Sequence, residues 1–272
     1  MLNSPLVVCA ALVSIAAAAA FYLELIPIWK RIRSESARLR ESGELAPAPT
    51  DAAHSSMMRI ARFLSRLFIG PITIVGRENL AELPGPFILT SNHSHPLDLV
   101  TLNILLDRKA RHPGAKGVLK LLGGFVAYVA SKWGMFSVDL DKGKSAAAYK
   151  AMVKVLESGE IVYLFAEGWT HMTGLVHEFK TGTVRSAREA SQVLGQTVPI
   201  VPVYIRYGWY PDESILKYHV AVQWLLTGFR FRGGASVVVG KPIDPLTLEE
   251  DPKLASARLR ATVIGLDPGK SA

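Results

Sequence analysis

Two polar side chains in one short segment have the residue types of a general base. Residues 91–98, which read SNHSHPLD, directly follow an apolar, strand-like run at 86–90. A carboxylate on one imidazole nitrogen fixes the tautomer of the ring and supports the cation that forms when the other nitrogen takes a proton. The pair His93 and Asp98 therefore predicts a general base that can activate a hydroxyl group. Such a mechanism needs no serine or cysteine nucleophile.

The spacing of this pair decides which elements must hold it. On one continuous helix the two side chains would lie about 140° apart, so they would not share a face. Pro96 is excluded from a helix interior but suits the first turn of a helix. We therefore expect His93 in a strand-to-helix loop and Asp98 in the first helical turn, where the helix dipole favours a carboxylate. A purely structural hydrogen bond is the alternative.

A second histidine, His95, adds a metal-binding alternative, because a His-x-His pair can bind zinc. A metal-dependent hydrolase built on His93 and His95 is therefore a competing hypothesis. The sequence offers no obvious third ligand set for it. We expect no metal.

The elements around this segment alternate between strands and helices. Short apolar runs that read as buried strands lie at 72–75, 86–90, 160–165, 199–206 and 235–239. Helical stretches lie at 97–107, 145–157 and 182–194. This alternation predicts an α/β fold with a mixed, largely parallel sheet flanked by helices. The apolar stretch 118–136 is too broken for a membrane span, and we expect it near a bilayer or in a substrate tunnel.

The N-terminal region has the composition of a membrane anchor. Residues 4–29 are mostly apolar, carry one charged side chain, Glu24, and are long enough to cross about 30 Å of hydrocarbon. Lys30, Arg31 and Arg33 follow at once, which predicts a cytoplasmic C-terminal side. A cleaved signal peptide is the alternative, although its basic n-region is missing. We expect a protein of the cytoplasmic (inner) membrane, with a helix that either spans or inserts shallowly.

A second amphipathic segment precedes the α/β region. Ile60, Phe63, Leu64, Leu67 and Phe68 recur at helical spacing, with arginines between them. This pattern is typical of an interfacial helix, and an ordinary core-facing helix is the alternative. The predicted domains are an anchor at 1–29, a charged segment and linker at 30–56, this helix at 57–70, a catalytic domain at 71–266 and a disordered tail at 267–272.

The net charge indicates which kind of partner the chain binds, and the cysteine content decides whether a disulfide can form. The chain of 272 residues has a formal net charge of +8, which favours a polyanionic partner. With an apolar anchor present, we interpret that partner as an anionic membrane surface rather than nucleic acid. Cys9 is the only cysteine, so no intrachain disulfide can form.

His93 and Asp98 match the His-x4-Asp motif of the glycerolipid acyltransferases, the lysophosphatidic acid acyltransferase-like superfamily. Further blocks resemble this family in the same order, and the resemblance runs from about Val75 to Pro245. Residues 75–80 and 85–86 resemble the segment that leads into the motif. The second block is Gly134 with Phe136, Val138 and Asp139. The third block is 165–168 with 179–182, and the fourth is 198–203.

The resemblance implies a membrane-bound O-acyltransferase that uses no covalent acyl-enzyme. His93 would deprotonate the hydroxyl of a lysophospholipid-type acceptor, and Asp98 would orient His93. The acyl donor would be acyl-CoA or acyl carrier protein, with no other cofactor. The resemblance also implies further site residues: Glu167, Gly168, Thr170, His171 and Lys180 at the acceptor, Gly134, Asp139 and Lys142 in the second block, and Pro202 in the fourth.

The sequence departs from the family pattern at two arginine positions. Leu140 and Thr170 stand where the second and third blocks usually carry arginine. A guanidinium fork is well suited to grip a phosphate. Without these arginines, the sequence does not specify the headgroup of the acceptor. Lys142, His171, Lys180 and Arg185 are the residues that could replace them in binding a phosphate. A non-catalytic membrane-surface protein that retains the fold is the remaining alternative.

Overall fold

The computed structural model describes residues 47–95, 97–115, 125–138, 145–210 and 233–270, with a few single positions between 26 and 37. Its helices are α2 (Asp51–Leu64), α3 (Glu78–Ala81), α4 (Asp98–Leu106), α6 (Phe125–Lys132), α7 (Ser145–Glu157), α8 (Gly182–Leu194) and α11 (Pro252–Gly265). Its strands are β1 (Ile72–Val75), β2 (Ile88–Ser91), β3 (His112–Ala115), β4 (Met135–Val138), β5 (Val162–Phe165), β6 (Ile200–Tyr207) and β7 (Ala235–Val239).

The central sheet has the strand order β1-β7-β6-β2-β5. All its pairs are parallel except β6 with β7, which run antiparallel. A second, parallel pair joins β3 to β4, and Arg111 bridges it to Val162 at the edge of β5. The predicted mixed, largely parallel α/β fold is therefore confirmed. The carboxyl ends of β2 and β5 lie side by side, which is where open α/β sheets bind their ligands.

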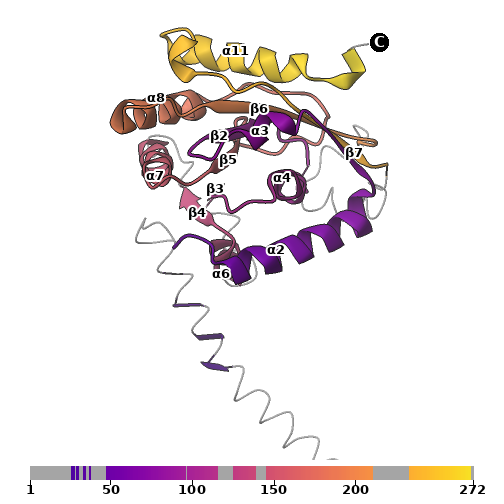
Figure 1. Ribbon diagram of the computed structural model, residues 1–272. Coiled ribbons are helices and arrows are strands. Elements are labelled where there is room, and N and C mark those ends of the chain that lie inside the picture. The colour runs from indigo at the N-terminus through magenta and orange to yellow at the C-terminus, as the bar shows by residue number, and fades with distance from the viewer. Residues whose placement is uncertain are drawn as a thin grey trace, which may run out of the picture.

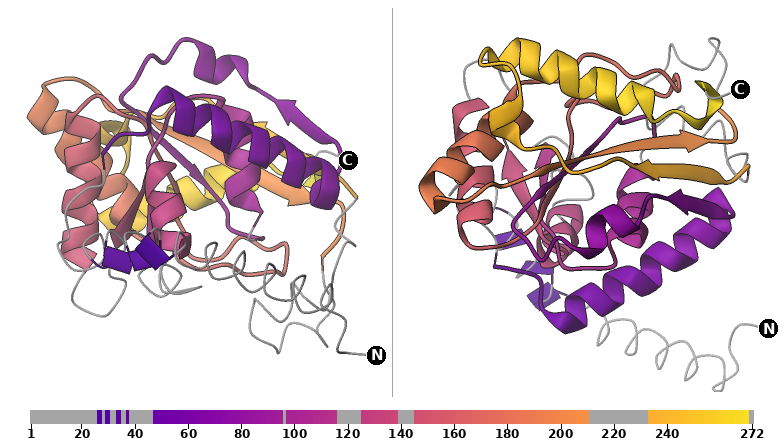
Figure 2. Two further views of the ribbon diagram at one scale, coloured as in Figure 1. Left: turned by 90° about the horizontal axis from the view of Figure 1, so that it is seen from below. Right: turned by 45° about the horizontal axis from the view of Figure 1, so that its top comes forward.

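Helices cover both faces of this sheet. Along β6, Val201, Val203 and Ile205 join the core cluster that contains α4, while Ile200 and Tyr204 join the cluster that contains α7, α8 and α11. This alternation follows from the two-residue repeat of a strand. In Figures 1 and 2, α11 lies on one side of the sheet and α2 on the other.

The predicted boundary between linker and amphipathic helix at 56/57 is wrong. Helix α2 begins at Asp51, because the Thr50 hydroxyl accepts a hydrogen bond from the Ala53 N–H at 3.2 Å and caps the helix. A π-helical turn, η1 (Ser65–Ile69), continues it. The predicted apolar face is divided, since Leu64 and Phe68 pack against the core but Ile60 and Phe63 do not. Met57, Met58 and Ala61 are buried, whereas Ile60 and Phe63 are 40% and 62% exposed.

The C-terminal end is more ordered than the sequence suggested. Helix α11 packs on the same face of the sheet as α7 and α8, against Ile200 and Tyr204 of β6. Asp251 caps its N-terminus, and Pro252 lies in its first turn. The predicted disordered tail is wrong for residues 267–270. Asp267 pairs with Arg206 at 3.1 Å and accepts from the Gly269 N–H, and a short 3-10 helix, η5 (Pro268–Lys270), follows.

Two membrane-related predictions fall largely outside the described residues. Within the described part of the chain, no helix combines the length and apolar character needed to cross a bilayer. The predicted anchor at 1–29 lies almost wholly outside that part. Of the apolar stretch 118–136, the described portion forms α6 and the start of β4.

Candidate active site

The loop that follows β2 is fastened to the neighbouring strand β6. The Asn92 side chain donates to the Ile205 carbonyl at 2.9 Å and accepts from the Ile205 N–H at 2.8 Å. The backbone pairing between β2 and β6 ends at Ser91, and the Asn92 side chain continues it with two hydrogen bonds to the backbone of β6. Sequence reasoning gave Asn92 no role, because its partner lies 113 residues away.

His93 and Asp98 meet as their spacing predicted. His93 Nδ1 lies 2.9 Å from Asp98 Oδ2, and Asp98 is the first residue of α4. The same carboxylate oxygen accepts from the His95 N–H at 2.8 Å, and Asp98 is fully buried. Because the carboxylate accepts a hydrogen bond from Nδ1, Nε2 is the ring nitrogen left to take a proton.

Three further contacts hold the His93 ring and backbone. The ring stacks on Phe165, the last residue of β5, with centroids 3.9 Å apart and planes 9° apart. The His93 N–H donates to Glu167 Oε1, and the His93 carbonyl accepts from the His171 N–H, both at 2.9 Å. The loop after β5 therefore clamps the loop after β2, and the imidazole has little freedom to turn.

A hydroxyl group already faces the basic nitrogen. Thr170 Oγ1 lies 2.6 Å from His93 Nε2. With Nδ1 protonated, the Thr170 hydroxyl donates to Nε2. This hydroxyl marks where a substrate alcohol must lie to lose its proton, since a general base acts across a hydrogen bond of this length.

Glu167 is the second buried carboxyl group of the site. Its side chain comes from the segment after β5 and is 3% exposed. Burial raises the pKa of Glu167 to about 7, while the backbone N–H groups of His93 and His177 act in the opposite direction. Its Oε2 atom is buried without a hydrogen-bond partner. Glu167 therefore holds the His93 backbone through Oε1, and its Oε2 can still accept a hydrogen bond.

Gly168, His171 and Lys180 lie close to Glu167, in the segment that follows β5. Gly168 has a φ of +74°, a left-handed conformation that favours glycine. The Lys180 N–H donates to the Ala166 carbonyl at 2.7 Å. Burial lowers the pKa of His171, with smaller effects from His177, His93 and the Lys180 ammonium. The structure thus brings together all the predicted third-block residues.

Two other predicted site residues, Gly134 and Pro202, make their backbone contacts elsewhere than at His93. Gly134 sits at the turn before β4 with φ +92°, and its carbonyl accepts from Arg111 Nε at 3.1 Å, which is a structural role. Pro202 lies within β6, paired with Thr90, and its carbonyl accepts from the Gly240 N–H. Asp139 and Lys142 lie outside the described residues.

His95 has a structural environment. It is fully buried, its Nδ1 accepts from the Leu97 N–H at 3.0 Å, and its ring packs against Tyr207. Burial lowers the pKa of His95 to about 4, so the ring is neutral near pH 7 and carries its proton on Nε2. Both nitrogens of His93 are engaged as well, which does not favour a metal held by His93 and His95.

A fourth histidine of this region, His177, was missed by sequence reasoning. Its ring stacks on that of His171, with centroids 3.8 Å apart. The ligand atoms of Glu167, His171 and His177 all lie within 4.8 Å of one another, a set that can hold a metal ion. The segment 166–181 has no periodic pattern that would signal this arrangement.

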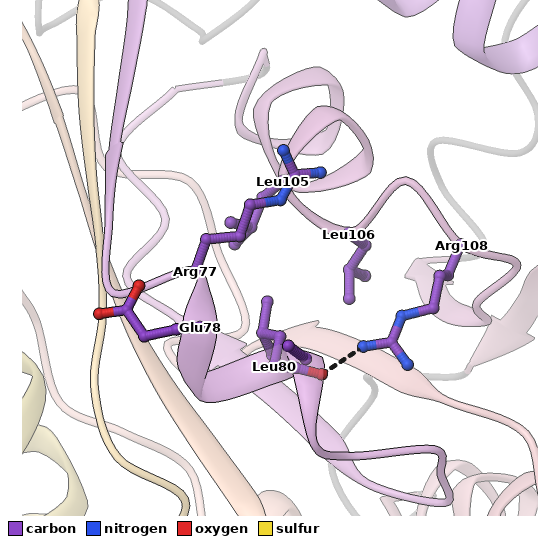
Figure 3. Close-up of a pocket in the computed structure, with 7 residues that line it drawn as sticks. Arg77, Glu78, Leu80, Leu105, Leu106 and Arg108 are labelled. Atoms are coloured by element: carbon purple, nitrogen blue, oxygen red, sulfur yellow. Dashed lines mark hydrogen bonds between the residues drawn. The ribbon is translucent and has the colours of Figure 1, made fainter.

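A hollow of about 500 Å³ lies away from these residues. Arg77, Leu80, Leu106 and Arg108 are among its lining residues, and Figure 3 shows them between α3 and the end of α4. Asp98 begins α4, so the hollow and the His93–Asp98 pair lie at opposite ends of a helix about 13.5 Å long. Arg108 is held by the Leu80 and Leu83 carbonyls. We do not assign the hollow to the active site.

Comparisons with known proteins bear on the family and the fold of the chain. The sequence profile of the Acyltransferase family matches residues 71–206, half of the chain. No curated protein matches the sequence significantly. Among solved structures, the fold is similar to that of the 1-acyl-sn-glycerophosphate (LPA) acyltransferase PlsC from Thermotoga maritima. That match has a TM-score of 0.56 and 18% identity, and it covers 80% of this chain and 81% of that one.

Proposed function

Because the chain belongs to the acyltransferase family, within the glycerolipid acyltransferase superfamily, we propose that it transfers a fatty acyl group from a thioester to a lysophospholipid-type alcohol. The observation that carries this proposal is the Asp98–His93 pair, whose Nε2 already faces a hydroxyl group at 2.6 Å. A buried carboxylate, an oriented imidazole and an alcohol are the parts that hydroxyl activation requires.

The proposed reaction needs no covalent acyl-enzyme. The acceptor alcohol displaces the Thr170 hydroxyl and gives its proton to His93 Nε2 as its oxygen attacks the thioester carbonyl. When the tetrahedral intermediate collapses, the C–S bond breaks and the leaving thiolate takes that proton from His93. Asp98 stabilises the imidazolium between these steps.

The donor and the membrane setting are further parts of the proposal. The donor is acyl-CoA or acyl carrier protein, which acts as cosubstrate, and no nucleic acid takes part. The enzyme works at the cytoplasmic face of the inner membrane, anchored by residues 1–29. Ile60 and Phe63, exposed on α2 next to Arg59, Arg62 and Arg66, support contact with an anionic bilayer. Recovery of the protein in the supernatant of alkali-washed membranes would contradict the anchor.

The activity test uses the full chain in vesicles, with a long-chain acyl-CoA or the matching acyl carrier protein as donor. The acceptors are lysophosphatidic acid, zwitterionic lysophospholipids and monoacylglycerol. We expect transfer to at least one of them, reduced by His93→Ala about 10²–10⁴-fold. His54→Ala, which changes a histidine on α2 outside the site, is the matched control.

Two results would contradict the proposal. Wild-type turnover by the His93→Ala variant would refute the general base. Binding to anionic vesicles without transfer to any acceptor from either donor would instead support a non-catalytic membrane-surface protein.

A further inference from the structure

Three side chains of the segment after β5 form a compact group of nitrogen and oxygen donors. They are Glu167, His171 and His177, and their ligand atoms all lie within 4.8 Å of one another. Around a zinc ion with bonds of about 2.1 Å, tetrahedral ligands lie about 3.4 Å apart. Side-chain rotations that open the stack of the His171 and His177 rings would bring the three donors onto one ion.

The buried carboxylate supplies an independent sign of a missing partner. Glu167 is 3% exposed, and its Oε1 accepts from the His93 N–H. Its Oε2 is buried and makes no hydrogen bond of regular geometry, although the His177 N–H lies near enough to act on the carboxyl group. Burying an unpaired carboxylate oxygen is costly, and most buried polar atoms in proteins are paired. A cation bound at Oε2 would remove that cost.

The two histidines are held in place on the same segment. The His171 N–H donates to the His93 carbonyl, and the Arg260 guanidinium donates to the carbonyls of Val176 and His177. Thr173 Oγ1 lies 3.2 Å from His177 Nε2 and restrains that ring.

We propose that Glu167, His171 and His177 bind one divalent transition-metal ion, with zinc as the best-suited probe. Two imidazoles and one carboxylate are a donor set that zinc accepts, and three protein ligands leave a fourth position open. The site shares no ligand with the His93–His95 alternative. It places the ion beside the backbone of the catalytic histidine, through Glu167 and His171.

The role of the ion rests on the proposed function. Thr170 and Leu140 stand at positions where the family resemblance leads us to expect phosphate-binding arginines. A divalent ion with an open position supplies positive charge to the segment that carries Thr170, and a phosphate oxygen of the acceptor can fill that position. The ion would then lower KM for a phosphate-bearing acceptor and leave KM for a neutral one unchanged.

The binding test needs no substrate. The full chain, in detergent and freed of metal with a chelator, is titrated with Zn²⁺ by calorimetry. We expect one ion per chain and an affinity at least about tenfold lower for His177→Ala. His54→Ala, at a partly buried histidine far from the group in sequence, should bind like wild type. Thermal melting of each variant verifies that it is folded.

Each result has a defined consequence. Equal zinc affinity in wild type and a folded His177→Ala variant overturns the site. If zinc binds as expected but leaves KM for lysophosphatidic acid unchanged, the site stands and its role in acceptor binding is refuted. Absence of acyl transfer with and without zinc refutes the proposed function, whatever the calorimetry shows.

Discussion

The loops that follow β2 and β5 lie side by side but differ in how they are built. In the β2 loop, Asn92, His95 and Asp98 are fully buried, and each is tied to the backbone. In the β5 loop, Trp169 and Leu175 are 55% and 66% exposed. The first loop therefore fixes the base rigidly, whereas the second presents side chains outward around one buried carboxylate.

Under the proposed function, this difference assigns the chemistry to the β2 loop and the choice of acceptor to the β5 loop. The β2 loop keeps the complete His-x4-Asp pattern, while the β5 loop carries one of the two departures from the family pattern, at Thr170. A rigid scaffold that carries a variable loop is a common way to change specificity without changing chemistry. Substitutions in the first loop should therefore reduce kcat, and those in the second should act on stability or KM.

The largest effect is expected from Asp98→Asn in the β2 loop. The amide keeps the size of the side chain but removes the charge that stabilises the His93 imidazolium. We expect kcat to fall about 10²–10⁴-fold with KM nearly unchanged. Steady-state kinetics measures this, and a melting curve verifies the fold. A loss below about tenfold in a folded variant would show that the carboxylate serves structure alone.

A smaller effect is expected from strain in the β5 loop. Gly168 has a φ of +74°, and an added Cβ would meet Lys180 Cγ only at 3.6 Å, an ordinary contact. Gly168→Ala should therefore lose about 1–2 kcal/mol from backbone strain alone. Gly134→Ala is the comparison, because its Cβ would also lie 2.4 Å from the Ala110 carbonyl oxygen.

Urea denaturation of both glycine variants gives the comparison directly. Gly134→Ala should be the less stable of the two. Wild-type stability of Gly168→Ala would mean that the β5 loop relaxes freely, which would contradict the view that it clamps His93.

Local patterns account for what the sequence predicted well. The strands at 72–75 and 235–239 and the helices at 145–157 and 182–194 have the predicted bounds, because apolar runs and helical periodicity are local signals. The His93–Asp98 contact was also predictable, since Pro96 and the five-residue spacing fix it within one loop. Helix α11 was missed although Asp251-Pro252 is a recognisable start signal.

Contacts between distant segments account for what it could not predict. His93 meets Thr170 across 77 residues, and Asn92 meets Ile205 across 113. The antiparallel pairing of β7 with β6 likewise depends on the whole sheet. His177 lies in an irregular segment, so nothing in the pattern links it to Glu167. Such contacts depend on the tertiary arrangement, which periodicity does not encode.

The smallest effect is expected from Thr170→Val, which removes the one side-chain contact between the β5 loop and His93 Nε2. Valine keeps the shape of threonine but has no hydroxyl. In this variant the acceptor alcohol therefore does not compete with the Thr170 hydroxyl for His93 Nε2. One net hydrogen bond is worth about 1 kcal/mol, or about fivefold. We therefore expect KM for the acceptor to fall by up to about fivefold, with kcat within about threefold of wild type.

Thr170→Ser, which retains the hydroxyl, should behave like wild type and serves as the control. A loss of kcat in Thr170→Val as large as that in Asp98→Asn would contradict direct transfer. It would mean that the hydroxyl beside His93 takes part in the chemistry, as a nucleophile that carries the acyl group. Mass spectrometry of the wild-type chain, mixed with donor alone, would then detect an ester on Thr170. Because direct transfer uses only the acceptor oxygen, this pair of variants decides whether the β5 loop merely positions the acceptor or also reacts.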